Sequence, residues 1–472
     1  MENRAIVGAN LVNTGERPEP ARWKVLLALF CVVISLLLWS NGLVESLKRP
    51  SVANDLERRQ LELAVLAAPN LPPALGQAFA GQDPLGRLQK HLDALGRSQA
   101  EAGQPASTDL LLEQALVAIH QGQRQRALPL LEQARGRDSA VATALLQAQP
   151  LAPAEAQRLS ASLAPVPLLR QWSCEALSGN PQACGQPHFG QRSALRLVLV
   201  NLLPGLTLLA GLGLLVRELW LRWRGRSLPL PPLAGPALGE IDAVLLVGGG
   251  FVVVGELVTP WLLGPAVESL LSLVALPPAL HSALSVLLLY LGLMAGPLLI
   301  LWWMLRGLGP APQGGWLQLG WLPPWLPAGR ALKGFLIVLP LVSLVSWLQD
   351  QLWSDPGGSN PLLELVLQGG ALAPLSCYAF TAIVLAPLFE ETIFRGVLLP
   401  VVARQRGPWL GVLVSGLVFA IAHLSLGELP ALLMLGLGLG WLRLSSGRLG
   451  ASVLMHSLWN AMTFANLVLL GS

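Results

Sequence analysis

Long apolar runs separated by short polar segments recur along most of the chain. A helix that crosses about 30 Å of hydrocarbon needs roughly 20 predominantly apolar residues. About nine runs approach this length, and the seventh and eighth of them are the shortest. The expected membrane spans are residues 25–44, 196–216, 242–263, 280–305, 334–350, 374–402, 408–424, 429–443 and 450–470.

The first apolar run has the flanks of either a signal peptide or a membrane anchor. Arg22 and Lys24 precede it, as basic residues precede the apolar region of a signal peptide. No pair of small residues with cleavage-site spacing follows it in residues 39–42. We therefore expect an uncleaved anchor.

The polar segment between the first and second spans, residues 46–195, is rich in Leu, Ala and Gln, which favours helices. Leu110–His120 and Ala127–Ala134 have the apolar spacing of a helical hairpin. One hairpin without a clear repeat period fits a generic helical bundle as well as a tetratricopeptide-like unit. In an oxidising compartment Cys174 and Cys184 can form a disulfide, and two buried thiols are the alternative.

Composition excludes a wholly soluble protein. Only 12% of the residues are charged and 53% are hydrophobic, whereas about one quarter of a soluble protein is charged. The charge is uneven, because residues 51–190 hold 23 charged side chains in 140 positions and residues 228–472 hold 18 in 245. The net charge of +4 does not indicate a nucleic-acid partner, since no Lys/Arg run with interleaved aromatic residues is present.

The distribution of basic residues predicts the orientation, because Lys and Arg near membrane spans stay on the cytosolic side. If nine spans alternate, the basic residues beside them all fall on one side, and the short loops opposite carry only acidic charges. We expect an integral protein of a prokaryotic plasma membrane with a cytosolic N-terminus, and with residues 46–195 and the C-terminus on the opposite side. The basic residues that carry this argument are Arg22, Lys24, Arg217, Arg222, Arg224, Arg226, Arg306, Arg330, Lys333, Arg404, Arg406, Arg443 and Arg448.

The sixth span contains two carboxylates and a guanidinium at positions where lipid or apolar core is expected. Glu391 and Arg395 are four residues apart, so they share a helix face and can neutralise each other. Glu390 points about 100° away and has no partner in its own helix. An ionisable group at this depth is costly and is usually functional. A structural ion pair explains Glu391 and Arg395, but it leaves Glu390 unexplained.

Two later spans add polar side chains. His423 ends the seventh, and His456 and Asn460 lie four residues apart on one face of the ninth. A lone histidine in an apolar helix is more often a packed core residue than a catalytic one, but here two histidines, an amide and a carboxylate occur together. At about 1.5 Å per residue, Glu390, His423 and His456 lie roughly 18, 22 and 9–16 Å from the cytosolic ends of their helices, so one pocket can hold them.

Such a pocket supports peptide hydrolysis. A desolvated glutamate can take a proton from water, a histidine can orient that water, and a second histidine with an amide can stabilise the oxyanion.

The motifs Glu-Glu-x-x-x-Arg, Phe-x-x-x-His and His-x-x-x-Asn, in this order on successive apolar helices, resemble the CPBP family of CAAX prenyl proteases and bacteriocin-processing enzymes, also called ABI. The resemblance covers roughly residues 330–470, and it implies an all-helical membrane bundle with an intramembrane active site.

The resemblance also implies roles for individual residues. Glu390 would be the base that activates water, and His423 its partner. His456 and Asn460 would form the oxyanion site. The pair that would hold this arrangement together is Glu391 and Arg395.

No cofactor is expected, because a metal-independent glutamate mechanism suits these residues. The zinc alternative would use Glu390, His423 and His456 as a set of two histidines and one carboxylate. The compact H-E-x-x-H helix typical of zinc proteases is missing. This alternative stays open from the sequence.

Two further features have ordinary structural explanations. Glu256 in the third span can pair with a neighbouring helix or lie near the outer surface, and contact with the active site is the less favoured alternative. Gly436, Gly438 and Gly440 in the eighth span alternate with leucine and predict close helix packing.

The sequence thus predicts an all-α, polytopic membrane helix bundle of about nine transmembrane helices with a helical extramembrane insert between the first two. The expected function is an intramembrane endopeptidase that cleaves a membrane protein or a lipidated peptide, and the insert is expected to bind a protein partner. The alternatives are a non-catalytic scaffold or immunity factor and, less favoured, a proton-relaying transporter. The predicted domains are 1–45 (cytosolic tail and anchor), 46–195 (extramembrane helices), 196–329 (spans and linkers) and 330–472 (catalytic bundle).

Overall fold

The regular elements of the protein are helices throughout the part of the chain that the structure describes. This computed structural model describes residues 21–48, 52–101, 103, 105–163, 166–180, 184, 188–226, 229–353, 358, 361–367 and 370–471. The all-α prediction is confirmed. Most of the predicted cytosolic tail, residues 1–20, lies outside the described residues.

Eight helices in the described ranges are long and apolar enough to cross a membrane, which confirms a polytopic membrane protein. The seventh predicted span forms α19 (Pro408–Ala422), whose 15 residues give about 22 Å. This helix is shorter than the hydrocarbon layer because the chain turns at its C-terminal end, where Leu424 has a positive φ of 50°. The eight longer segments are α1 (Arg22–Ser46), α10 (Phe189–Trp223), Glu240–Leu271, α13 (Pro278–Arg306), α14 (Trp325–Leu352), Leu372–Arg406, α20 (Leu429–Ser446) and α21 (Leu449–Gly471).

The chain divides into two compact units. The membrane unit comprises Met1–Ser51, Leu206–Leu362 and Ala371–Phe464. The insert unit comprises Val52–Gly205, Leu363–Gly370 and Ala465–Ser472.

Short helices form the insert unit around a leucine-rich core. The predicted hairpin is present as α5 and α6, which pack against each other. Cys174 in α9 forms a disulfide with Cys184, and their Cα atoms are 5.8 Å apart. The helices are α2 (Val52–Ala67), η1 (Ala68–Asn70), α3 (Pro73–Phe79), α4 (Pro84–Glu101), α5 (Thr108–His120), α6 (Arg124–Arg135), α7 (Ala140–Gln147), α8 (Pro153–Ala161), α9 (Pro167–Ser178) and most of α15 (Pro361–Leu367).

A buried charge cluster joins α2 to α5 in this unit. Glu113 is fully buried and forms an ion pair with Arg58, which also contacts Glu62 at 3.1 Å between Nε and Oε1. Burial, followed by the nearby charge of Glu62, raises the pKa of Glu113 well above its usual value of 4.5. Burial alone would lower the pKa of Arg58, but the carboxylates of Glu113 and Glu62 raise it overall.

This cluster should make the insert unit less stable as pH rises. A carboxyl group whose pKa is raised by folding stabilises the folded state fully below its unfolded pKa, and that contribution is lost as pH rises through the folded pKa. Each pH unit in this window costs about 1.4 kcal/mol. Glu113→Gln should remove this slope, because an amide has no proton to lose. Thermal unfolding of the purified full chain between acidic and neutral pH would measure the slope, and an unchanged slope would contradict the assignment.

Proline residues divide two of the long segments of the membrane unit into α-helical and π-helical parts. Proline has no amide hydrogen and its ring clashes with the carbonyl group four residues earlier, so the turn before it widens. The first segment contains α11 (Glu240–Val244), π-helical η3 (Leu245–Val258) and α12 (Thr259–Leu271). The second contains α16 (Leu372–Phe380), π-helical η4 (Thr381–Leu385), α17 (Ala386–Glu391), π-helical η5 (Thr392–Leu398) and α18 (Leu399–Arg406).

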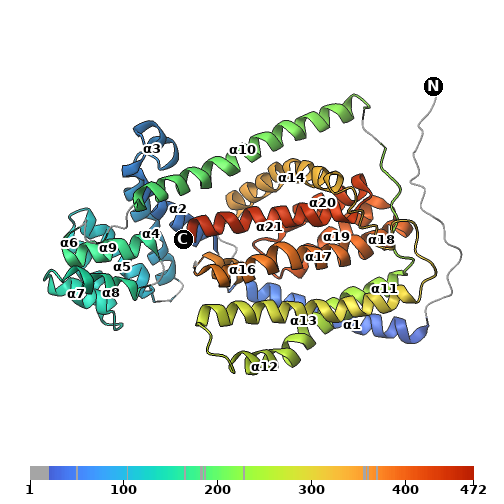
Figure 1. The fold of residues 1–472 in the computed structure, drawn as a ribbon, viewed down its shortest axis with the longest axis horizontal. Coiled ribbons are helices and arrows are strands. Elements are labelled where there is room, and N and C mark those ends of the chain that lie inside the picture. The colour runs from blue at the N-terminus through green and yellow to red at the C-terminus, as the bar shows by residue number, and fades with distance from the viewer. Residues whose placement is uncertain are drawn as a thin grey trace. The chain divides into compact units, whose positions relative to one another are not determined.

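Close helix contacts place the second of these segments inside the membrane unit. Helix α14 packs on α20, and α20 packs on α19, while α16 packs on α13 (Figure 1). The predicted role of the eighth-span glycines is confirmed, because a Cβ atom on Gly436 would lie 2.9 Å from the Cα atom of Gly416 on α19. Glycine at both positions lets α19 and α20 approach to backbone contact.

Candidate active site

The Glu-Glu-x-x-x-Arg motif lies where α17 meets π-helical η5. Pro387 follows η4 and Pro400 follows η5, so each widened turn comes just before a proline. A π-helical turn inside an α-helix is often found at a functional site. Here Glu391 and Arg395, four residues apart, form an ion pair at the start of the π-helical segment.

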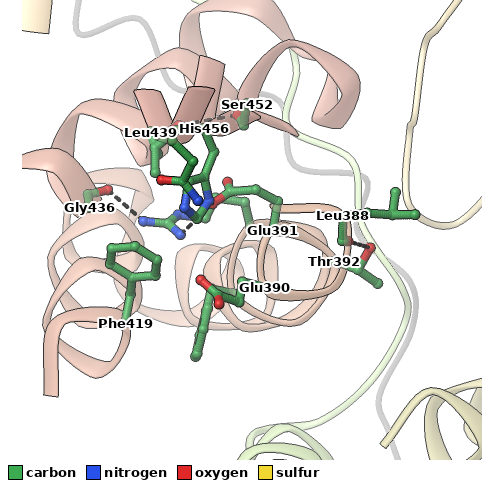
Figure 2. A network of polar contacts seen from close by, with 12 residues as sticks. Leu388, Glu390, Glu391, Thr392, Phe419, Gly436, Leu439, Ser452 and His456 are labelled. Carbon is green, nitrogen blue, oxygen red and sulfur yellow. Dashed lines mark hydrogen bonds and ion pairs between the residues drawn. The ribbon is translucent and has the colours of Figure 1, made fainter. Parts of the chain in front are cut away.

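A buried polar cluster surrounds Arg395. Its Nη1 atom donates to Glu391 Oε1 at 2.7 Å, and both side chains are fully buried. Its Nη2 atom donates to the carbonyl oxygen of Gly436 at 3.0 Å, and its guanidinium carbon lies 4.5 Å from the ring centroid of Phe419. His456 Nδ1 lies 3.1 Å from the same Glu391 oxygen (Figure 2). One guanidinium thus connects three membrane helices.

His456 and His423 each have one ring nitrogen held by a defined partner. Nδ1 of His423 lies 2.8 Å from the carbonyl oxygen of Phe419. A carbonyl oxygen only accepts, so this nitrogen carries the proton and donates. Neutral His423 therefore has Nε2 as an acceptor. The Phe419 ring makes T-shaped contacts with both imidazoles, with centroid distances of 4.6 Å to His423 and 5.5 Å to His456.

Glu390 makes a different hydrogen bond from Glu391, although both carboxylates interact with the charge of Arg395. Its Oε1 atom accepts a hydrogen bond of 3.3 Å from the hydroxyl of Tyr290 on α13. Its Oε2 atom is buried and has no hydrogen-bond partner among the described residues. Figure 2 shows the Glu390 side chain apart from His456, which contacts Glu391 instead. The two adjacent carboxylates therefore have different hydrogen-bond partners, as their offset of about 100° predicts.

Asn460 connects α21 with the segment Leu372–Arg406, which contains the Glu-Glu-x-x-x-Arg motif. Its Nδ2 atom donates to the carbonyl oxygen of Ala382 in η4 at 2.8 Å. An amide nitrogen has two hydrogens, so one donor remains after this bond. About two helix turns before it, Ser452 donates to the carbonyl of Leu439 on α20 at 3.2 Å.

The structure thus brings four predicted residues together through shared partners, namely Glu391, Arg395, His456 and, through Phe419, His423. Glu390 and Asn460 belong to the same helices but bind other partners. The residue that the motifs did not indicate is Tyr290. The sequence feature that could have indicated Tyr290 is its rarity, because it is one of two tyrosines of the chain and lies within an apolar span. No motif connects it with Glu390.

Glu256 pairs with a neighbouring helix, which was one of the predicted alternatives. Its Oε2 atom accepts a hydrogen bond of 3.0 Å from Nε1 of Trp39 on α1. This contact gives the half-buried Glu256 side chain a partner away from the motif residues.

The hydrogen bonds of the two histidines bear on the zinc alternative. Nδ1 of His456 contacts Glu391 and Nδ1 of His423 contacts a backbone carbonyl, so Nε2 is the nitrogen of each histidine that remains for a metal ion. Across the described part of the chain, no three His, Cys, Asp or Glu side chains are grouped closely enough to hold a metal ion.

Comparison with known proteins gives separate family matches for the insert and for the motif helices. Residues 53–195 match a family described as a domain of unknown function (DUF8675). The chain is also similar to an uncharacterized 24.3 kDa protein of Escherichia coli, with 41% identity over 103 residues, which are 21% of this chain and 48% of that protein. The match thus spans about half the length of that relative. No solved structure matches the chain significantly.

The motif helices match a second family. The model for type II CAAX prenyl endopeptidase Rce1-like proteins covers residues 373–462, which contain all six predicted site residues. This match is consistent with a CPBP-family protease and agrees with the order of the three motifs. Residues 373–462 are therefore similar to the Rce1-like domain of type II CAAX prenyl endopeptidases.

Proposed function

We propose that the membrane unit is an intramembrane endopeptidase in which Glu390 activates a water molecule to hydrolyse a peptide bond. The observation that carries the proposal is the Glu390 carboxyl group, which has one oxygen held by a hydroxyl and the other buried without a partner. An unsatisfied buried oxygen costs free energy, and such groups are concentrated at sites that use their chemistry. The Rce1-like match supports the same reaction class.

In the proposed reaction, the Glu390 carboxylate takes a proton from water while the water oxygen attacks the carbonyl carbon of the scissile bond. A carbon–oxygen bond forms and the carbonyl oxygen becomes an oxyanion. When this intermediate collapses, the carbon–nitrogen bond breaks and the proton on Glu390 passes to the leaving amine. The products are an amine and a carboxylic acid, which then loses its proton to solvent, and Glu390 returns to its starting state.

The neighbouring polar residues can assist each step. The Nε2 acceptor of His423 can orient the water, because Nδ1 is fixed as a donor to Phe419. The second amide hydrogen of Asn460 can donate to the oxyanion. Protonated His456 can donate from Nε2, since Glu391 accepts from Nδ1 and stabilises the positive charge of the ring.

We propose a membrane protein or a lipidated peptide as the substrate, because the site lies among membrane-spanning helices. The proposed orientation has a cytosolic N-terminus, with residues 46–195 and the C-terminus on the opposite side. We propose that no cofactor takes part and that the insert unit binds a protein partner. The apolar helices support the bilayer as the environment of the membrane unit.

Comparative proteomics of membrane fractions tests this proposal. In cells that carry Glu390→Gln instead of the wild-type chain, at least one membrane protein or lipidated peptide should accumulate uncleaved. Glu268→Gln on α12 is a matched control, because its carboxylate is largely exposed and forms a surface pair with His281. Identical membrane proteomes in wild-type and Glu390→Gln cells would contradict the proposal. A phenotype that survives Glu390→Ala and His423→Ala but is lost on deletion of residues 50–190 would favour a scaffold.

A further inference from the structure

A tyrosine from outside the matched domain contacts the proposed base. Tyr290 lies on α13, about 80 residues before the start of the Rce1-like match at residue 373. Its hydroxyl donates to Oε1 of Glu390 at 3.3 Å. The ring packs against the main core of the membrane unit, and α13 also packs against α16 and η4. The rest of the side chain is therefore held by packing while its polar tip reaches the carboxyl group.

This contact distinguishes the two oxygens of Glu390. Oε1 is engaged by the phenol, while Oε2 is buried without a partner. A carboxylate whose one oxygen is anchored has less freedom to rotate about its terminal torsion, which is otherwise broad. Oε2 is then the oxygen that remains available to accept a proton from water.

We propose that Tyr290 is a positioning residue for Glu390 that fixes the carboxylate with Oε2 directed to the water. This inference rests on the proposed function of Glu390. It assigns a functional position to α13, which lies outside the family match. Because Tyr290 acts through Glu390, its loss should slow the chemical step and leave substrate binding nearly unchanged.

Infrared spectroscopy of the purified full chain tests the contact without any substrate. The carboxylate stretching bands of Glu390 are identified by subtracting the spectrum of Glu390→Gln from that of the wild type. Tyr290→Phe removes only the hydroxyl, so it should shift these bands. The control is Tyr378→Phe on α16, because Tyr378 is the other tyrosine of the chain, whereas within the described residues the hydroxyl that binds Glu390 is that of Tyr290. Glu390 bands that do not respond to Tyr290→Phe would overturn the inference.

Kinetics test the positioning role. The probe is a quenched-fluorescent peptide that spans the cleavage site of the protein that accumulates in Glu390→Gln cells. Tyr290→Phe should lower kcat by about 10- to 100-fold, the range expected for one hydrogen bond to a charged group, with KM changed by less than about twofold. Tyr378→Phe should keep both constants.

The outcomes separate this inference from the proposed function. A shifted Glu390 band with wild-type kcat in Tyr290→Phe would overturn the positioning role and leave the base assignment intact. Full activity in Glu390→Gln would overturn the proposed function, whatever the infrared bands show. The positioning role would also be overturned if Tyr290→Phe raised KM and reduced the amount of folded protein but left kcat unchanged.

Discussion

Replacing Glu390 with glutamine should lower the cleavage rate by about 100- to 10,000-fold, because an amide cannot take a proton from water. Glutamine has almost the same volume as glutamate. Its carbonyl oxygen can still accept the hydrogen bond that Tyr290 donates to Oε1. The substitution should therefore remove the chemistry and preserve the packing, and single-turnover cleavage by purified protein in detergent would measure the effect.

The adjacent carboxylate provides the matched control for this experiment. Glu391→Gln leaves the buried guanidinium of Arg395 without its ion-pair partner, so it should lower thermal stability, whereas Glu390→Gln should change the melting temperature by no more than about 2 °C. The two variants have the same chemical change at neighbouring positions. A cleavage rate for Glu390→Gln close to the wild-type rate would refute the base assignment. A large fall in its melting temperature would show that the loss of activity is structural.

The membrane helices could be predicted well because a span needs a long apolar run, and this requirement is visible in the sequence. The seventh span was predicted at residues 408–424, and α19 (Pro408–Ala422) has nearly these bounds, but its 15 residues make it shorter than the eight helices that are long enough to cross a membrane. Hydropathy does not report the backbone turn that follows His423. His423 lies directly after the last residue of α19, at the end of the span as the sequence predicted.

The spacing of the motifs predicted the contacts within one helix of the candidate site, but not the contacts between helices. Glu391 and Arg395 are four residues apart, and helix geometry alone brings them into contact. The partner of Glu391 on α21, His456, depends on how separate helices pack, and spacing within one helix carries no such information. Tyr290 could not be predicted for the same reason, since 100 residues separate it from Glu390.

The basic residues at helix ends show a further limit of sequence patterns. Arg443 was one of the charges that indicated a cytosolic boundary, and such charges are usually solvated. It is fully buried and donates from Nη2 to the carbonyl oxygen of Ala234 at 2.8 Å. Arg448 donates to the carbonyl oxygen of Gly320 at 2.8 Å. These arginines hold loop segments against the helix bundle, a role that depends on tertiary contacts.

Replacing Arg395 with methionine should lower the free energy of unfolding by about 3–5 kcal/mol, because it leaves the fully buried carboxylate of Glu391 without its charge partner. Methionine fills much of the same space, so a cavity contributes little. The lost contacts also include the carbonyl oxygen of Gly436 and the face of Phe419. Denaturant unfolding of the purified chain in detergent would measure the change.

The double variant Glu391→Gln with Arg395→Met separates the unpaired charge from the other losses. If the buried carboxylate causes most of the destabilisation, removing both charges should recover most of the lost stability, since replacing a whole buried ion pair is often nearly neutral. Glutamine also keeps a side-chain oxygen that can accept from His456 Nδ1. A coupling energy near zero in this double-mutant cycle would contradict the ion pair as the main contribution of Arg395. Retained stability in the double variant with no cleavage would instead assign the pair to orienting His456 as well as to holding the helices together.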